Sequence, residues 1–301
     1  MKKRMRQKRK FTPYLYSTPA CILIALVIVF PILYTAYISL TNMNLFHWAN
    51  YEVIGLENYA RALTKVDSGF LAALLTTLLW TVLNMVIQVV AAYFIALGLN
   101  REGLKGRRIY KTLLMFPWAM PAYVSILLWR VGIYNTEFGL LNKVLVALGF
   151  SKVNFLSTNV PAFISCMVLN LWMALPFMIM MIDGALQSID KSYYESAKLD
   201  GAGFWVTNIH ITIPALKGII APSVIMTTFT TFKQFDIVYL LTMQKGAYSG
   251  ATLQTVITYA QQNAFVSNNY GLSSAVSIII FVLIMIFSIV TNRGVKEESY
   301  E

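Results

Sequence analysis

Charged side chains, cysteines and histidines are all scarce in this sequence. Only 12% of its 301 residues are charged, and it contains two cysteines and two histidines. Cys21 and Cys166 lie in separate apolar segments without metal-ligand spacing, so we expect small apolar roles for both and neither a disulfide nor a metal site. His47 and His210 do not form an H-E-x-x-H motif or a similar arrangement. These shortages argue against chemistry that depends on thiols, metal ions or imidazole bases.

Acidic residues are sparse as well, and a nucleotide-binding loop is absent. From Ala162 to the last apolar segment the acidic residues form no evident acid/base pair, and they are Asp183, Asp190, Glu195, Asp200 and Asp236. The sequence has no G-x-x-x-x-G-K-[ST] phosphate loop, so it cannot bind ATP in that way. We therefore expect a protein that is not an enzyme and that uses no cofactor and no metal.

Long apolar segments are abundant instead. Hydrophobic residues make up 57% of the chain and the mean hydropathy is +0.62, which is too apolar for an ordinary soluble domain. About 20 apolar residues in a helix cross the hydrocarbon core of a bilayer. Six segments meet this requirement: Pro19–Ser39, Phe70–Leu97, Tyr110–Val131, Ala162–Ile182, Ile213–Leu241 and Leu272–Val290. We predict an all-α polytopic membrane protein with six transmembrane helices.

The distribution of lysine and arginine predicts the orientation of these helices. Seventeen lie in the N-terminal tail, the second and fourth connections and the C-terminal tail, against five in the other connections. By the positive-inside rule both termini are cytoplasmic. We expect a basic cytoplasmic tail at 1–18, a six-helix transmembrane region at 19–292 with an uncleaved first span, and a cytoplasmic tail at 293–301. The net charge of +11 then requires no nucleic acid as a partner.

Prolines occur inside or at the edges of the predicted spans. Among them are Pro31, Pro117, Pro121, Pro176, Pro214 and Pro222. Proline removes a helix hydrogen bond, and helices that line a cavity can satisfy the freed carbonyl groups. This pattern favours helices that line a transport path over simple anchors, although transmembrane helices also tolerate proline in general.

The connection between the fourth and fifth spans, 183–212, is polar enough to carry structure of its own. Ser192 and Glu195 fit a capping box at a helix start, and Gly201 fits a left-handed cap at its end. A helix from Tyr193 to Asp200 would be marginal by itself, because such short helices are unstable in water. The segment is either a capped surface helix or a helix that inserts into a cytoplasmic ATPase.

The same connection carries a longer pattern. Glu195-Ser196-Ala197 is followed after three residues by Gly201 and, after nine more, by Ile211-Thr212-Ile213-Pro214. The pattern resembles the E-A-A, G, I-x-L-P signature of binding-protein-dependent ABC importer permeases, with one serine and one isoleucine as departures. The resemblance implies a type I importer permease fold in which this segment is the cytoplasmic coupling helix. The ATPase-coupling residues that it implies are Glu195, Ser196, Ala197, Asp200 and Gly201.

The resemblance covers the chain from Leu56 to Val290. It is carried by G-L-E-N-Y at Gly55–Tyr59, by F-G-L-L-N at Phe138–Asn142 and by the run Phe116–Leu127. These segments are most similar to MalF-type subunits of maltose and maltodextrin importers. The resemblance therefore implies a sugar as the transported molecule.

In MalF-type subunits the sugar lies between the two spans that flank the coupling helix. The positions that this implies are Asn170, Met173, Ala174 and Phe177 on the fourth span and Thr227, Thr230, Thr231 and Gln234 on the fifth. Each set has the spacing i, i+3, i+4, i+7 and therefore lies on one helical stripe. Hydroxyl and amide groups are costly at this depth unless they meet water, a partner or a ligand. Bonds from the threonines to their own or a neighbouring helix are the alternative.

Lys233 and Asp236 are the two charged residues near the end of the fifth span, and because they are three residues apart they would share one face of a continuous helix. A lone charge in the bilayer is costly, so we expect these two side chains to form a structural or gating ion pair near the outer end of the span. A role in ligand binding is the alternative, and an anionic substrate would make Lys233 its first candidate contact.

The resemblance implies a permease subunit of an ATP-driven importer for oligosaccharides of the maltose or maltodextrin type, in a bacterial cell membrane. Its implied partners are an ABC ATPase dimer, a second, MalG-like permease subunit, membrane lipid and an extracellular solute-binding protein that meets the loops Asn42–Gly69 and Gly132–Asn159. The alternatives are the same machine with glycerol phosphate, an acidic oligosaccharide or another neutral sugar as its cargo, an ion-coupled secondary carrier, or a membrane-embedded enzyme. A carrier would normally show inverted repeats and an intramembrane acid, and we see no repeat.

Overall fold

A computed structural model of the chain describes residues 16–64, 69–243 and 253–298. Within these ranges the regular elements are all helices, and the only β-type pairing is one isolated bridge between Thr41 and Val53. The all-α class is therefore confirmed. The predicted basic tail lies outside the described residues except for 16–18, and of the predicted C-terminal tail only the helical backbone up to Glu298 is described.

The predicted spans correspond to helices that are long and apolar enough to cross a membrane. Five are helical segments that each form one candidate span: Tyr16–Ile38, Phe70–Leu99, Asn159–Ser188, Phe204–Thr242 and Tyr270–Thr291. The fourth of these is interrupted after Phe232, and helix resumes at Asp236. The sixth is the pair Arg107–Ala119 and Ala122–Ile133, which meet at 91°. The predicted third span is thus broken, because Met120 is extended (ψ 140°) ahead of Pro121, and a residue before proline avoids the helical region.

The chain divides into two compact units. The first comprises Met1–Leu71 and Tyr259–Leu283. Its described helical elements include the π-helical stretch η1 (Ala25–Val29) and the helix α2 (Phe30–Ile38) that continues it. They also include α3 (Glu57–Thr64), most of α13 (Val256–Phe265) and the first half of α14 (Tyr270–Glu298); the label η marks π-helical stretches throughout.

Asn58 organises the turn that follows the first span. Its side chain is 2% exposed, and its Nδ2 donates to the carbonyl oxygens of Ser39 (3.0 Å) and Thr41 (2.7 Å). Gly271 lies so close to this turn that a Cβ there would come within 2.2 Å of the Thr41 carbonyl oxygen. The asparagine of the G-L-E-N-Y segment therefore has a structural role in the first unit.

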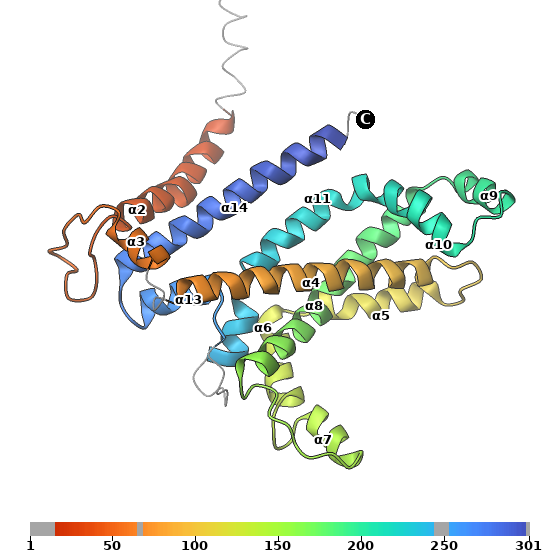
Figure 1. Ribbon diagram of the computed structural model, residues 1–301, viewed down its shortest axis with the longest axis horizontal. Helices are drawn as coiled ribbons and strands as arrows, with labels where there is room; N and C mark the ends of the chain where they lie inside the picture. Colours follow the sequence, from red (N-terminus) through yellow and green to blue (C-terminus); the bar gives the residue numbers. More distant parts are fainter. Residues whose placement is uncertain (1–15, 65–68, 244–252, 299–301) are drawn as a thin grey trace, which may run out of the picture. The chain divides into compact units, whose positions relative to one another are not determined.

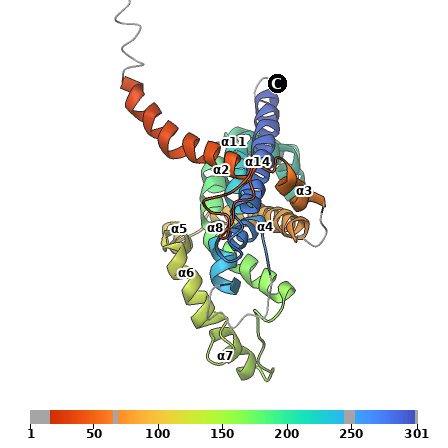
Figure 2. The same ribbon diagram turned by 90° about the vertical axis from the view of Figure 1, so that its left-hand side faces the viewer.

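The second unit comprises Ala72–Thr258 and Ile284–Glu301. Its elements before the polar connection are α4 (Phe70–Leu99), α5 (Arg107–Ala119), α6 (Ala122–Leu128), η3 (Trp129–Ile133), α7 (Leu140–Ala147) and α8 (Asn159–Ser188). The connection and the fifth span form α9 (Lys191–Leu199), α10 (Phe204–Thr207), η4 (Asn208–Thr212), α11 (Ile213–Phe232), α12 (Asp236–Val238) and η5 (Tyr239–Met243). Figure 1 shows α9 and α10 at the ends of α8 and α11, and Figure 2 shows α5, α6 and α7 following one another through the bend.

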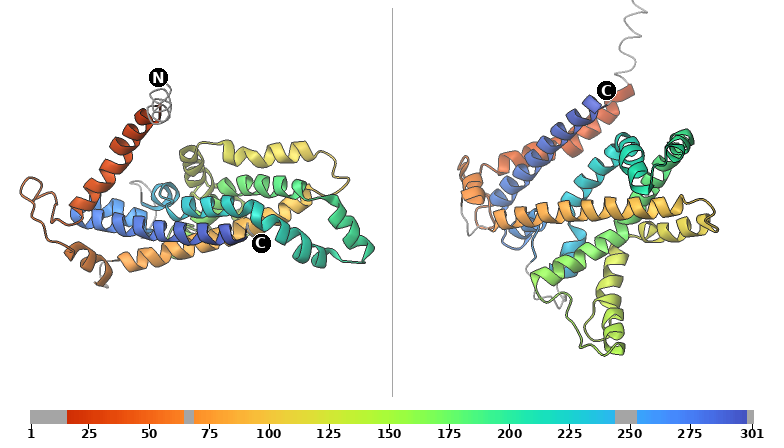
Figure 3. Two further views of the ribbon diagram at one scale, coloured as in Figure 1. Left: turned by 90° about the horizontal axis from the view of Figure 1, so that it is seen from above. Right: turned by 45° about the vertical axis from the view of Figure 1, so that its right-hand side comes forward.

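α8 is the central helix of the second unit. It packs against α5 on one side and α11 on another, and the two views of Figure 3 show it among these neighbours. One apolar cluster gathers around Trp80 and Leu169, and a second gathers around Ile179, Ile182 and Leu216. Of the two cysteines, Cys166 is buried on α8 as expected, whereas Cys21 is exposed.

Candidate functional site

The polar connection folds as the short helix α9. Asp190 is its N-cap, and the Asp190 carboxylate accepts a hydrogen bond from the Ser192 backbone N–H at 2.9 Å. This N–H holds the pKa of Asp190 below its ordinary value. The predicted capping box is therefore wrong: the helix begins two residues earlier than expected, and Glu195 lies beyond the reach of a cap.

The end of α9 is closed as predicted. Gly201 is left-handed (φ +75°), its N–H bonds to the Lys198 carbonyl (3.2 Å), and the Ala202 N–H bonds to the Ala197 carbonyl (2.9 Å). This pair of bonds is a Schellman motif, which satisfies carbonyl groups that a helix end would otherwise leave free.

α9 is anchored on one face and open on the other. Tyr194 donates from its hydroxyl to Thr212 Oγ1 of η4 (3.3 Å), and Ala197 is buried. Glu195 is exposed, as are Tyr193 and Leu199, of which the leucine is 89% exposed. A two-turn helix that leaves its large apolar side chains uncovered lacks the packing that such helices need, so its open face suits a partner.

The four predicted positions on α8 are all occupied by contacts with other helices of the second unit. Asn170 donates from Nδ2 to Asn84 Oδ1 of α4 (2.8 Å), and the Ala174 carbonyl accepts from Gln88 Nε2 (2.9 Å). Phe177 is stacked on Trp118 of α5 with centroids 6.3 Å apart. The fourth, Met173, packs on the Trp80 cluster.

The predicted positions on α11 have more varied surroundings. Thr227 and Thr231 are buried, and Thr231 Oγ1 lies 4.0 Å from Met85 Sδ. Thr230 is exposed, and its hydroxyl donates to the Thr227 carbonyl (2.8 Å). Gln234 is not on the helical stripe, because α11 ends at Phe232.

α4 touches both stripes and carries functional candidates that sequence reasoning missed. Asn84 bonds to the α8 stripe and its neighbour Met85 to the α11 stripe, so both stripes lie against α4 at one level. Gln88, one helical turn from Asn84, is fully buried, and its Oε1 has no partner among the described residues. The sequence signal that could have identified them is the presence of the single amide side chains Asn84 and Gln88 inside an otherwise apolar span.

The predicted pairing of Lys233 with Asp236 is wrong. In the part of the chain that the structure describes, no ion pair within 4.0 Å joins them, and both are exposed. The reason is a helix break: Lys233 is the C-cap of α11, and Asp236 begins α12. The one-turn spacing of a continuous helix therefore does not apply to them.

Several apolar helices of membrane-spanning length, with a capped polar helix between two of them, define a multi-pass membrane protein of the transporter class. Residues 88–294 match the family "Binding-protein-dependent transport system inner membrane component". The chain belongs to this family, and it is a multi-pass component of the inner membrane.

Similar proteins agree with this assignment. The chain is 33% identical over 277 residues to the "Trehalose/maltose transport system permease protein MalF" of Thermococcus litoralis, a match that covers 92% of this chain and 91% of that protein. It is 29% identical to the "Galactooligosaccharides transport system permease protein GanP" of Bacillus subtilis, with 94% and 70% covered. The fold is similar to a chain from a bacterial ABC transporter involved in the import of the acidic polysaccharide alginate, with a TM-score of 0.82, 20% identity and 99% of both chains covered. The expected type I importer permease fold is confirmed.

Proposed function

We propose that this chain is the permease subunit of an ATP-driven importer for oligosaccharides of the maltose or maltodextrin type, and that it catalyses no reaction itself. The names of its relatives support a sugar cargo. The chemistry of the two stripes supports it too, because amides and hydroxyls bond to sugar hydroxyls while an aromatic ring such as Phe177 supports the apolar face of a sugar ring. Sugar contacts are proposed at Asn170, Met173, Ala174, Phe177, Thr227, Thr230, Thr231 and Gln234.

The proposed machine has further parts. An ABC ATPase dimer grips α9, a second, MalG-like permease subunit completes the sugar path, and an extracellular solute-binding protein delivers the sugar. Both termini are cytoplasmic in this proposal, because the lysine and arginine excess lies on the side of α9. Residues 19–292 then form one transmembrane permease region between two cytoplasmic tails.

The observation that carries the proposal is the exposed, doubly capped helix α9 at the position of the family signature. The cap residues Asp190 and Gly201 define where the helix begins and ends. Its exposed side chains Glu195 and Leu199 are available for contact with a partner. ATPase closure would move α9 and thereby switch the sugar path between inward and outward access.

The test is uptake of labelled maltotriose and ATP hydrolysis by the complete transporter in proteoliposomes. Glu195→Lys and Gly201→Asp are each expected to lower uptake at least tenfold while the chain still inserts into the membrane, because they place a reversed charge or a bulky side chain in the coupling contact.

Two substitutions elsewhere are matched controls. Gly103, in the connection between α4 and α5, is also left-handed (φ +79°) with open space around it, so Gly103→Asp imposes the same kind of backbone strain outside the loops expected to meet the solute-binding protein. Glu102→Lys reverses the charge of an exposed side chain in the same connection. Normal uptake in both α9 variants, or an equal loss in the controls, would contradict the coupling role.

One observation favours a second cargo class, the acidic oligosaccharides. Lys233 is exposed without an ion pair to Asp236 and could meet an anionic sugar. Under this alternative, Lys233→Met would lower uptake of a uronic acid trisaccharide and leave maltotriose uptake unchanged. The neutral cargo is supported if wild-type transporter takes up maltotriose and the acidic sugar does not compete. Uptake with the ATPase deleted would instead indicate a secondary carrier.

A further inference from the structure

Four polar side chains surround the carboxylate of Asp183, near the end of α8. Asn100 Nδ2 and Arg107 Nη2 lie 2.8 Å and 3.1 Å from Oδ1, while Lys111 Nζ and Gln187 Nε2 donate to Oδ2, the latter at 2.9 Å. The Asp183 side chain is only 3% exposed. We call these five residues the Asp183 cluster.

A buried charge of this kind fixes the positions of the helices that share it. Desolvation of a carboxylate is unfavourable, and here two cations and two amides compensate for it. Removing one partner of such a group is strongly destabilising, because the remaining charge stays buried without compensation. The cluster therefore holds Arg107 and Lys111 of α5 firmly against Asp183 of α8.

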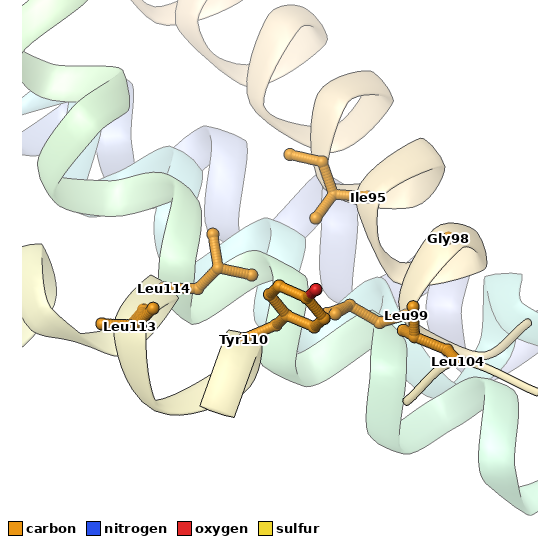
Figure 4. A pocket seen from close by; sticks show the side chains of 7 residues that line it. All are labelled: Ile95, Gly98, Leu99, Leu104, Tyr110, Leu113 and Leu114. Carbon is orange, nitrogen blue, oxygen red and sulfur yellow. The ribbon is translucent and has the colours of Figure 1, made fainter. Parts of the chain in front are cut away.

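α5 has little else to hold its first turns in place. None of its thirteen residues, all of which the structure describes, is fully buried. Toward α4 its side chains leave a cavity of about 440 Å³ rather than a close contact. Figure 4 shows this cavity between Ile95 and Leu99 of α4 and Tyr110, Leu113 and Leu114 of α5. The ion pairs of Arg107 and Lys111 with Asp183 therefore add a specific attachment to α8 at this end of α5.

The same stretch of α8 leads directly into α9. Gln187 is one residue from the end of α8 at Ser188, and Asp190 already caps α9. A displacement of α9 therefore reaches Asp183 through only two extended residues, Ile189 and Asp190, and the last turn of α8.

The other end of α5 reaches the level of the proposed sugar contacts. Seven residues beyond Lys111, Trp118 stacks on Phe177 of α8, with an angle of 19° between the rings. The chain then bends by 91° into α6. α5 thus connects the ionic cluster at one end with an aromatic contact and a sharp bend at the other.

We propose that the Asp183 cluster is the linkage that makes α5 move together with α9, so that Asp183, Arg107 and Lys111 are positioning residues for transport. This inference rests on the proposed coupling function of α9. With the linkage intact, α9 and α5 move as one body, and this motion also displaces the Trp118–Phe177 contact and the bend into α6. Without it, the ATPase moves α9 while α5 stays behind.

The first test replaces the whole cluster core by apolar side chains. The triple variant Asp183→Leu, Arg107→Met, Lys111→Met keeps a similar total side-chain volume and leaves no buried charge in the cluster, so it is expected to fold and assemble. It should hydrolyse ATP within about twofold of wild type, while the maltotriose imported per ATP falls at least tenfold. The matched control Glu102→Leu, Lys105→Met removes two opposite, exposed charges from the connection that leads into α5, outside the cluster and outside the loops expected to meet the solute-binding protein, and should leave this ratio unchanged.

The second test measures the motion itself, which a merely structural role would not affect. Spin labels at Arg108→Cys on α5 and Lys191→Cys on α9, in a background of Cys21→Ser and Cys166→Ala, report the distance between these helices. In the otherwise intact cluster the distance should be the same in the nucleotide-free and vanadate-trapped transporter. In the triple variant it should change between the two states. A change already present with the intact cluster would overturn the proposal.

The outcomes separate this inference from the function on which it rests. If Glu195→Lys abolishes uptake but the triple variant imports normally per ATP, the linkage is wrong and the coupling role of α9 stands. If both variants are normal, both proposals are wrong. If the triple variant does not assemble, the spin-label distance in the intact cluster decides, and a change between the nucleotide-free and vanadate-trapped states contradicts the linkage.

Discussion

α8 and α11 flank the same polar connection, each contains an internal proline, and each carries proposed sugar contacts, yet they are packed very differently. α8 buries twelve of its thirty residues, including the polar Asn170 and Asp183. α11 buries three of its twenty, namely Leu216, Thr227 and Thr231. α8 is therefore a scaffold within this chain, whereas most of the α11 surface is left for lipid or another chain. Substitutions on α8 should affect stability and transport together, and those on α11 should affect transport alone.

The largest effect is expected for Asn170→Leu on α8. The substitution leaves the Oδ1 of the buried Asn84 without its donor, which costs about 1–3 kcal/mol, and it also removes a proposed sugar contact. We expect a lower thermal unfolding temperature of the purified transporter and maltotriose uptake reduced by at least tenfold.

The double variant Asn84→Leu, Asn170→Leu separates the two effects of the Asn170 change. Replacing both partners by apolar groups of similar shape is nearly neutral for stability, so the unfolding temperature should recover while uptake stays low. Recovery of uptake in the double variant would show that Asn170 acts only through packing with Asn84.

A smaller effect is expected for Phe177→Ala. The ring is half-buried and stacked on Trp118, so its loss removes a proposed platform for the sugar and a contact between α8 and α5. We expect the KM for maltotriose to rise about tenfold, equivalent to about 1.4 kcal/mol. Phe177→Tyr keeps the aromatic face and should stay within about twofold of wild type. An unchanged KM in the alanine variant would contradict sugar contact at this position.

The difference between α8 and α11 could be predicted from the sequence only in part. Six apolar segments follow from the length that a bilayer requires, and the left-handed Gly201 follows from its place after a helical pattern. The start that the sequence predicts for α9 is wrong because Asp190 and Ser192 are both good N-cap residues, and only the backbone conformation shows that Asp190 is the one used. Which of these two residues caps α9 depends on where α8 ends.

Contacts between distant helices were the part that could not be predicted. Arg107 and Lys111 were counted as charges that orient the chain, since their partner Asp183 lies more than seventy residues away. The predicted Lys233–Asp236 ion pair is wrong for the opposite reason: residues three apart share a face only within one helix, and a helix break separates these two. Spacing rules hold within one element. The spacing of residues along the sequence predicts neither the break after α11 nor the packing of α8 on α5.

The smallest effect is expected for Thr230→Val on α11. Thr230 is exposed and its hydroxyl bonds only to the Thr227 carbonyl of its own helix in the described structure, so its loss should not change the unfolding temperature. At this exposed position one lost hydrogen bond to sugar is expected at the low end of the usual range, about 0.5 kcal/mol, so the KM for maltotriose should rise about twofold. Thr228→Val is the matched control: its hydroxyl makes the same kind of bond, to the Val224 carbonyl at 2.8 Å, but Thr228 is not on the proposed stripe. If both variants raise KM equally, the effect comes from the helix backbone, and the proposal that α11 presents Thr230 to the sugar is wrong.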